Sequence, residues 1–313
     1  MIELKDLTKI FDGIVAVDSL SLSIEPGEVL GFLGPNGAGK STTMKMLTGF
    51  LKPDAGSASI YGYDVQSDLN AIKQIIGYLP EGAPAWGEMT TAEFLRFVAD
   101  IRQIAANDKQ SSIDHVVAQL ELGTVLHRPI DTLSKGFKRR VGIAQAIIHD
   151  PKVLILDEPT DGLDPNQKHQ VRELIRSLAT DKIVIISTHI LEEVNAVCSR
   201  AVIISEGKLL ADKTPAELEL QSRYHNAITI ALGDDTDVRS ALTSMSEIAG
   251  VEQHAHDAHT FTVFPVNGES IYAIVSKAAS ENQWPVESLH VERGRLDDVF
   301  RDVTTNVSTE VAA

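Results

Sequence analysis

A glycine-rich segment that follows a short apolar run constrains the fold of this chain more than any other sequence feature. The apolar run, Val29–Leu33, has the length of a buried strand, and residues 40–47 have the spacing of a helix. The segment between them matches G-x-x-x-x-G-K-[ST], a pattern in which glycines let backbone N–H groups converge on phosphate oxygens. The predicted phosphate-binding residues are Gly34, Pro35, Asn36, Gly37, Ala38, Gly39, Lys40, Ser41 and Thr42.

Two carboxylates at the end of a later apolar run narrow the chemistry of this phosphate site. Residues 153–156 have the length of a buried strand, and Asp157 and Glu158 follow directly. Such a strand tip can hold Mg²⁺ through Asp157 and leave Glu158 to polarise water for in-line attack on a phosphate. Lys40 would then reach the β- and γ-phosphates, and Ser41 would place its hydroxyl on the metal. An acidic pair alone is more often just a solvated turn, so the prediction depends on this pair following Lys40 by 117 positions in the order of the two motifs.

Five further segments follow one another in the order found in ATP-binding cassette (ABC) ATPases, and the chain resembles that family from about Ile2 to Glu217. The segments are Phe11, which matches the adenine-stacking aromatic residue; Tyr78-Leu79-Pro80-Glu81, at the place of the Q-loop; Leu133-Ser134-Lys135-Gly136-Phe137, similar to the signature LSGGQ; Gly162-Leu163-Asp164, similar to the D-loop; and Ser187-Thr188-His189, similar to the loop of the switch histidine.

The resemblance implies an α/β fold, the P-loop NTPase cassette, with a mixed sheet and a helical subdomain at about residues 81–150. We expect this nucleotide-binding domain to span residues 1–217 and a small accessory α+β domain to span residues 218–313. The second domain reads strand, helix (238–248), strand, strand, helix, strand and a last helix, an order that a split βαβ sandwich would produce.

The resemblance also implies that two nucleotide-binding domains pair head to tail around ATP and Mg²⁺. Each ATP would lie between the phosphate loop of one subunit and the signature of the other. There Ser134 caps a helix whose N–H groups face the γ-phosphate, and Gly136 allows close approach. His189 would hold the γ-phosphate, Asp164 would orient the loop that meets the opposite subunit, and Glu81 would contact Mg²⁺ or water. The opposite subunit is either a second copy of this chain or a paralogous ATPase subunit.

Two motifs depart from the family pattern. The signature has Lys135 and Phe137 in place of glycine and glutamine, and Glu81 stands where the Q-loop has glutamine. Lys135 either adds positive charge near the phosphates or is simply exposed. Both departures also occur in the ATP-binding subunits of type-2 exporters of the multidrug-export and gliding-motility types, and residues 296–300 resemble a C-terminal motif of the multidrug-export members. With these departures we still expect the chain to hydrolyse ATP, and the rate of hydrolysis is the property that they affect.

The exporter resemblance implies a separate membrane permease as partner, because no apolar run reaches the ~18–20 residues that span a bilayer. We expect the permease to dock near Tyr78 to Phe97, and the protein to be cytoplasmic and peripheral on the inner face of the cell membrane. The competing class is a soluble ABC ATPase that acts on ribosomes or DNA without transport. A neighbouring reading frame that encodes a multi-spanning protein would favour transport.

Charge and cysteine content bear on the remaining partner classes. The chain has 44 acidic and 28 basic residues, a net charge of −16, and it carries no basic stripe, so nucleic acid is not an expected partner. The single cysteine, Cys198, excludes an internal disulfide and fits a reducing compartment. His254, His256 and His259 form either a metal site or an exposed hairpin, and the hairpin is the commoner arrangement.

Overall fold

The computed structural model describes residues 1–83 and 85–310 and divides into two units, Met1–Thr214 and Pro215–Ala313. The first unit contains the glycine-rich loop and the paired carboxylates, and the second contains the C-terminal strands and helices. Pro84, inside the predicted docking segment and helical subdomain, and residues 311–313, at the end of the predicted second domain, lie outside the described residues.

A six-stranded sheet forms the centre of the first unit. Its order is β10-β9-β3-β8-β7-β6, with β10 antiparallel to β9 and the other five strands parallel. Parallel strands end at one edge of a sheet, so the segments that follow β3, β6, β7 and β8 meet there. The strands are β3 (Val29–Leu33), β6 (Ile76–Leu79), β7 (Val153–Asp157), β8 (Ile183–Thr188), β9 (Arg200–Ser205) and β10 (Lys208–Lys213).

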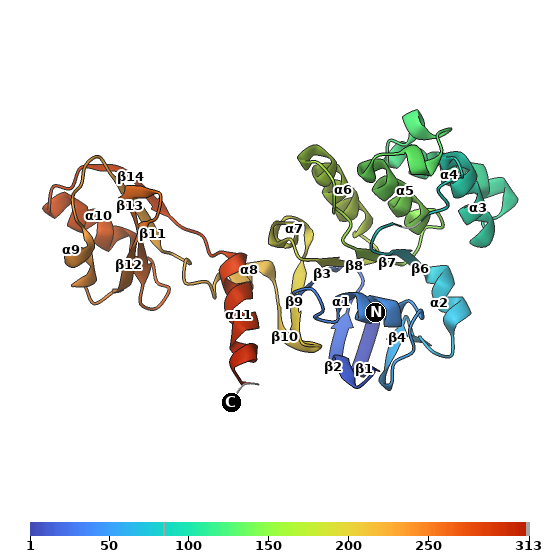
Figure 1. Cartoon of the computed structure of the whole chain (residues 1–313), viewed down its shortest axis with the longest axis horizontal. Coiled ribbons are helices and arrows are strands. Elements are labelled where there is room, and N and C mark those ends of the chain that lie inside the picture. Colours follow the sequence, from blue (N-terminus) through green and yellow to red (C-terminus); the bar gives the residue numbers. More distant parts are fainter. Residues whose placement is uncertain (84, 311–313) are drawn as a thin grey trace. The chain divides into compact units, whose positions relative to one another are not determined.

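An antiparallel sheet and one helix cover one face of the central sheet (Figure 1). The antiparallel order is β2-β1-β4-β5, and its apolar face packs with α1 and the central strands into a single buried cluster. The elements are β1 (Ile2–Phe11), β2 (Ile14–Ile24), α1 (Lys40–Leu47), β4 (Ala55–Ile60), β5 (Tyr63–Asp64) and α2 (Leu69–Ile75).

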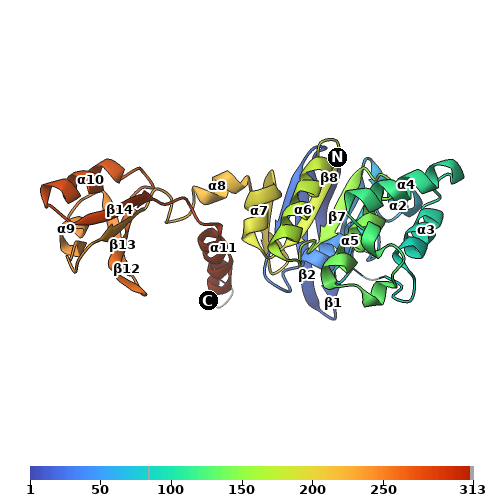
Figure 2. The same ribbon diagram turned by 90° about the horizontal axis from the view of Figure 1, so that it is seen from above.

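Helices cover the opposite face of the central sheet, and their starts follow from local sequence (Figures 1 and 2). Thr90 and Glu93 form a reciprocal capping box at the start of α3, while Ser134 caps α5 and Asp164 caps α6, with Pro165 in its first turn. The elements are α3 (Thr91–Ile101), α4 (Ala106–Gln119), two 3₁₀ turns (Gly123–Val125 and Ile130–Thr132), α5 (Lys135–Ile147), α6 (Pro165–Leu178) and α7 (Leu191–Val197).

Gly31, in the middle of β3, allows α7 to pack closely on the sheet. A Cβ atom at Gly31 would lie 2.9 Å from the Sγ atom of Cys198, at the end of α7. Burial raises the pKa of the Cys198 thiol to about 12, so the side chain behaves as a small apolar group in this packing.

The second unit has a four-stranded antiparallel sheet of order β12-β13-β11-β14, with its own apolar core. This is the split βαβ arrangement expected from the element order. The elements are α8 (Pro215–Glu219), β11 (Ile228–Leu232), α9 (Arg239–Thr243), β12 (Ile248–His254), β13 (Asp257–Pro265), α10 (Tyr272–Glu281), β14 (Val286–Val291) and α11 (Leu296–Glu310).

Two features of the elements differ from the sequence prediction. The predicted helix at 238–248 is wrong in its second half, because α9 ends at Thr243 and Ile248 pairs with Pro265 in the sheet. The short elements β5, α2, β6 and β10 were not predicted. Within the described residues, no helix combines the length and apolarity that crossing a membrane requires.

Candidate functional site

Two glycines of the phosphate loop (residues 34–41) lie too close to neighbouring backbone to carry a side chain. A Cβ atom at Gly39 would lie 2.4 Å from the carbonyl oxygen of Ala16, and one at Gly34 would lie 2.5 Å from that of Ile204. Gly39 also has φ of 104°, which favours glycine. It precedes α1 without making a side-chain cap, so the first N–H groups of α1 face the loop, as anion binding requires.

Lys40 is the charged centre of this loop. Its side chain is buried, and its Nζ atom donates to the carbonyl oxygen of Gly34 at 2.6 Å. Burial lowers the pKa of Lys40, while the nearby carboxylates of Glu158, Asp157 and Glu81 act in the opposite direction. The predicted lysine and the three predicted carboxylates therefore lie within electrostatic range of one another.

The paired carboxylates sit at the end of β7 in an unusual backbone conformation. Asp157 is buried, and its Oδ1 atom accepts a hydrogen bond from the hydroxyl of Ser187 on β8. Glu158 has φ of 50°, in the left-handed region that non-glycine residues rarely adopt. Its N–H donates to the carbonyl oxygen of Ser187 at 3.0 Å, and its own carbonyl oxygen accepts from Arg139 and from the N–H of Asp161. These contacts hold a conformation of the kind that clusters at functional sites.

His189 lies directly beside Glu158. Its Nδ1 atom is 2.9 Å from Oε1 of Glu158, and its side chain is exposed whereas Glu158 is largely buried. Ser41 and Thr42 are half-buried in the first turn of α1, and Glu81 is exposed after β6. The edge of the central sheet thus carries carboxylates, a histidine, a lysine and hydroxyl groups around the phosphate loop.

A second group of predicted residues gathers at the start of α5 and α6. The hydroxyl of Ser134 accepts from the N–H of Phe137, and a carboxylate oxygen of Asp164 accepts from the N–H of Gln167. A Cβ atom at Gly136 would lie 2.4 Å from Oε1 of Gln167, so the two helix starts are in direct contact. The predicted signature and D-loop residues therefore lie at two adjoining helix starts, where Ser134 and Asp164 are exposed and Gly136 is buried.

The two substituted signature residues are accounted for locally. Lys135 is exposed, and its aliphatic stem lies near Gly162, where a Cβ atom would be 3.2 Å from its Cδ atom. Phe137 is half-buried, with the guanidinium of Arg140 5.7 Å from its ring centre. Lys135 is thus on the surface, which both interpretations of this residue allow.

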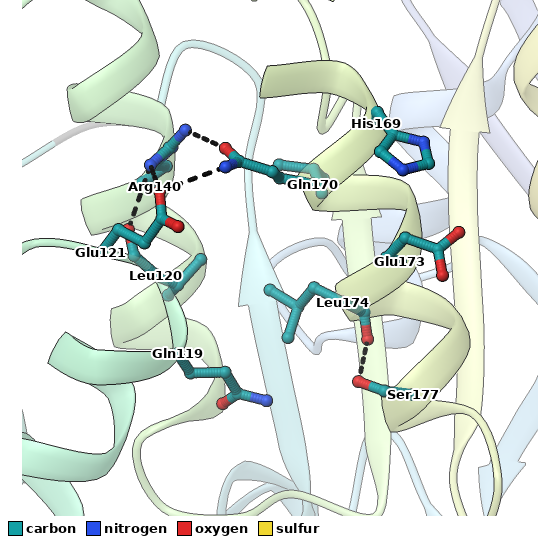
Figure 3. A pocket seen from close by; sticks show the side chains of 10 residues that line it. Gln119, Leu120, Glu121, Arg140, His169, Gln170, Glu173, Leu174 and Ser177 are labelled. Atoms are coloured by element: carbon teal, nitrogen blue, oxygen red, sulfur yellow. Dashed lines mark hydrogen bonds and ion pairs between the residues drawn. The ribbon is translucent and has the colours of Figure 1, made fainter. Parts of the chain in front are cut away.

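Arg140 clamps α5 to α6 beside a pocket of about 430 Å³ (Figure 3). The guanidinium is buried, donates to the carboxylate of Glu121 at 3.1 Å and also donates to the side-chain oxygen of Gln170. The amide of Gln170 in turn donates to Glu121 at 3.2 Å. The clamp joins the helix that begins at the signature to the helix that begins at the D-loop.

The predicted adenine-stacking residue lies at the tip of the β1–β2 hairpin. Phe11 pairs with Ile14 across the turn and is 42% exposed. The Nζ atom of Lys9 lies 5.3 Å from the ring centre. Strand β2 leads from this tip to Ala16, which touches the phosphate loop at Gly39.

A groove of about 820 Å³ lies between the helical layer and the segment after α1. Trp86 and Phe50 line it and are 58% and 78% exposed, and Trp86 packs edge-on against Phe97 with ring centres 4.8 Å apart. Tyr78 also lines the groove, and burial raises the pKa of its hydroxyl to about 12. The groove lies along the predicted docking segment, and Trp86 contributes to its surface rather than to the core.

Sequence reasoning missed three buried residues that support the site. Arg139 donates to the carbonyl oxygens of Glu158 and Pro80, and its only sequence signal is membership of a basic cluster on an otherwise apolar helix. Thr160 and Glu193 are buried and joined by a hydrogen bond. No periodic pattern marks either of them.

The histidine cluster of the second unit lies at the β12–β13 hairpin. His254 contacts the hydroxyl of Thr262 at 2.9 Å, and His259 contacts the carbonyl oxygen of Asp234 at 2.8 Å. Across residues 1–83 and 85–310, no group of three or more histidine, cysteine or carboxylate side chains is arranged to hold a metal ion. The geometry favours the hairpin interpretation.

A phosphate loop and a strand-end glutamate beside a histidine define a nucleotide-hydrolysing cassette, and comparison with known proteins specifies its family. Residues 17–161 match the family model described as "ABC transporter". The Nod factor export ATP-binding protein I of Burkholderia pseudomallei (strain 1710b) is 34% identical over 304 residues, covering 97% of this chain and 96% of that protein. The chain therefore belongs to the ABC transporter family and is an ATP-binding, ATP-hydrolysing subunit homologous to exporter ATP-binding proteins.

Two further comparisons agree with this membership. ABC transporter A family member 1 of Dictyostelium discoideum is 39% identical over 229 residues, which cover 72% of this chain. The chain spans only 26% of that longer relative. A solved structure described as an ATP-binding subunit of an ABC transporter superposes with a TM-score of 0.66 at 29% identity, covering 71% of this chain and 92% of the other.

Proposed function

We propose that this chain hydrolyses ATP with Mg²⁺ at the edge of its central sheet to power export through a separate membrane permease. The contact between His189 and Glu158, at the strand end that Lys40 also faces, is the observation that carries the proposal. The homology to an exporter ATP-binding protein over nearly the whole chain supports the direction of transport.

Each group at the sheet edge has a defined role in this proposal. Lys40 and the N–H groups of α1 bind the phosphates, and Phe11 stacks on the adenine. Glu158 accepts a proton from the attacking water, and its carboxylate is aimed by the backbone contacts that fix its φ. His189 donates a hydrogen bond to the γ-phosphate, next to the water that Glu158 orients.

The donor set at the same place fits a magnesium ion. Asp157 and Ser41 supply a carboxylate and a hydroxyl oxygen, and Glu81 supplies a second carboxylate within electrostatic range of Lys40. When bound, the ion neutralises charge on the β- and γ-phosphates. The hydroxyl of Ser187 occupies one lone pair of Asp157, which orients the carboxylate.

The signature surface supports a paired form of the protein. Ser134, Gly136 and Asp164 lie at two adjoining helix starts, where N–H groups favour an anion. In our proposal this surface meets the phosphate loop of a second ATPase subunit, either another copy or a paralogue. The closed site then consists of one phosphate loop and one signature.

The groove between Phe50 and Trp86 is our proposed docking site for the permease. It is lined by exposed aromatic side chains, a composition enriched at protein interfaces. We expect Trp86→Ala to reduce co-purification of the permease while leaving ATP affinity unchanged, because Trp86 lies on the docking segment. Equal recovery of permease with parent and variant would contradict this placement, and the protein would then act at a membrane through another surface.

The proposed chemistry is tested by Glu158→Gln. The amide cannot accept the proton of water, so we expect ATP to bind normally, turnover to fall by ~10²-fold or more, and an ATP-bound dimer to accumulate. Phosphate release and size-exclusion chromatography with ATP and Mg²⁺ measure both effects. Lys40→Ala serves as the control that loses nucleotide binding by calorimetry, and hydrolysis by Glu158→Gln at the parental rate would refute the assignment.

A further inference from the structure

Glu193 is a buried carboxylate that joins the loop after β7 to the last residue of β8. It lies in the first turn of α7 and is 3% exposed. Its Oε2 atom accepts a hydrogen bond from the hydroxyl of Thr188 at 2.9 Å, and its Oε1 atom accepts one from the hydroxyl of Thr160. Glu193 therefore links two segments that are distant in sequence and adjacent at the site.

The two threonines flank the residues that face the phosphate. Thr160 lies two positions after Glu158, and Thr188 lies directly before His189. The hydroxyl of Thr188 also accepts from the N–H of Ile190 at 3.0 Å, so the backbone is fixed on both sides of His189. A change in the bridge is therefore transmitted to both side chains through one or two residues of backbone.

The exposed contact between His189 and Glu158 needs such a support. The imidazole is more than half exposed, and exposed contacts between titratable groups contribute little to holding a geometry. The bridge through Glu193, by contrast, is buried at all three of its members: Thr160, Thr188 and Glu193. Asp157 on β7 also pairs with Ser187 on β8 in the parallel sheet, which links the two strands that precede Glu158 and His189.

The environment of Glu193 makes both hydroxyl donors necessary. Burial raises the pKa of its carboxylate, while the hydrogen bond from Thr188 acts to lower it. A buried carboxylate that lost a donor would leave an unsatisfied oxygen, which is costly in a dry environment. The bridge is thus a specific three-residue arrangement rather than general packing.

We propose that Glu193 is a positioning residue for ATP hydrolysis, which keeps Glu158 and His189 at their contact distance through Thr160 and Thr188. The proposal rests on the roles assigned above to Glu158 and His189. Glu193 itself contacts neither of these side chains through a hydrogen bond in the structure, and it acts through the two threonines.

The test compares kcat and KM for ATP in the full chain carrying Glu193→Ala, Glu193→Gln or the matched control Glu192→Ala. Glu192 is the exposed neighbour on the same helical turn. Loss of a supporting partner typically costs ~10–100-fold in activity, so we expect kcat of Glu193→Ala to fall by about that factor. KM and the calorimetric ATP affinity should stay within about twofold, because a change that disturbs only the transition-state geometry lowers kcat and leaves substrate binding unchanged. Glu193→Gln retains an acceptor oxygen and should recover most of kcat, and Glu192→Ala should match the parent.

A second variant keeps the proposal testable if Glu193→Ala does not fold. Thr160→Val removes one donor with little change in shape, and it should also lower kcat without changing KM. Where Glu193→Ala does fold, its effect and that of Thr160→Val should not be additive in a double-mutant cycle, since both changes remove the same hydrogen bond. A parental kcat in folded Thr160→Val or Glu193→Ala would overturn the proposal, as would equal loss of kcat and ATP affinity with no recovery in Glu193→Gln. Glu158→Gln in the same assay separates the two proposals. If Glu158→Gln retains activity, the proposed chemistry fails. If Glu158→Gln is inactive while Glu193→Ala hydrolyses ATP at the parental rate, only the positioning role of Glu193 fails.

Discussion

Several titratable side chains of the first unit are buried, and their burial makes the stability of the folded protein depend on pH. His149 follows α5 and is largely buried, with its Nε2 atom 3.0 Å from the carbonyl oxygen of Ile76. The Nδ1 atom has no hydrogen-bond partner among the described residues. Burial, and then the positive charge of Arg102, lower the pKa of His149 to about 4. The folded protein therefore holds this imidazole neutral across the physiological range.

The lowered pKa of His149 predicts a loss of stability in mild acid. In the unfolded chain a histidine takes up a proton near pH 6.5, whereas the folded protein resists protonation until about pH 4. The unfolded state therefore binds more protons between these values, and the free energy of unfolding should fall as pH falls through that window. Urea titrations at pH 7, 6, 5 and 4 measure this, and His149→Gln should show a smaller fall than the parent. Identical pH dependence in the two proteins would show that other groups cause the loss.

The residue scale also shows where sequence reasoning stopped. The glycines, Lys40 and the paired carboxylates were found because phosphate chemistry requires those residue types at fixed spacing. Glu193 was not found, since the neighbouring pair Glu192-Glu193 has the composition of a solvated helix start and only the packing of α7 turns one of them inward. Arg139 was missed for the same reason, because a buried arginine cannot be distinguished from an exposed one by composition.

At the scale of elements, helix α5 contacts several separate parts of the site in the first unit. Its first residue follows the Ser134 cap, and its second turn carries the two buried arginines. Arg139 contacts the backbone of Glu158, and Arg140 contacts Glu121 and α6. The helix therefore connects the signature surface to the hydrolytic end of β7 and to the D-loop helix.

The Arg140 clamp predicts a measurable contribution to stability and to the signature surface. Arg140→Ala removes hydrogen bonds to Glu121 and Gln170, and we expect the free energy of unfolding to fall by ~1–3 kcal/mol. The geometry of the two helix starts should also loosen, so ATP-dependent dimer formation should weaken while monomeric ATP affinity is retained. Urea unfolding and size-exclusion chromatography of the parent, Arg140→Ala and Arg140→Lys check this. A variant with parental stability and dimerisation would mean that the clamp contributes to neither property.

Elements were predicted well where side-chain period or motif chemistry was strong and poorly where they were short. Strands β3 and β7 are continuous buried runs, and the sequence predicts them because both faces of a parallel sheet are covered. Strand β6 is four residues long and the sequence pattern does not predict it, because its pairing partner β7 lies far away in sequence. The second half of the predicted helix at 238–248 instead joined the sheet, where cross-strand pairing overrode helical spacing.

At the scale of the whole molecule, the chain is built from two units with separate cores. The two apolar clusters of the first unit draw only on residues before its boundary at Thr214, and the cluster of the second unit draws on residues 228–289. The phosphate loop, the paired carboxylates and the signature all belong to the first unit. The second unit supplies none of the proposed nucleotide-binding residues.

This division predicts that the first unit folds and binds nucleotide alone. A chain that ends at Thr214 should retain ATP affinity within about threefold, because its core is complete without the second unit. Calorimetric titration with ATP and a thermal melt measure affinity and cooperativity. Loss of cooperative melting in the shortened chain would show that the first unit depends on the second for stability.

The close approach of Gly31 to Cys198 has a consequence for how this sequence can drift over evolutionary time. A methyl group at residue 31 would lie 2.9 Å from the sulfur, so a larger residue there requires the sulfur to move or a smaller side chain to replace it. The two sites are expected to change together, with a larger residue in β3 accompanied by a smaller one at the end of α7. Descendants of this gene should therefore preserve the combined volume of the pair more faithfully than the identity of either residue.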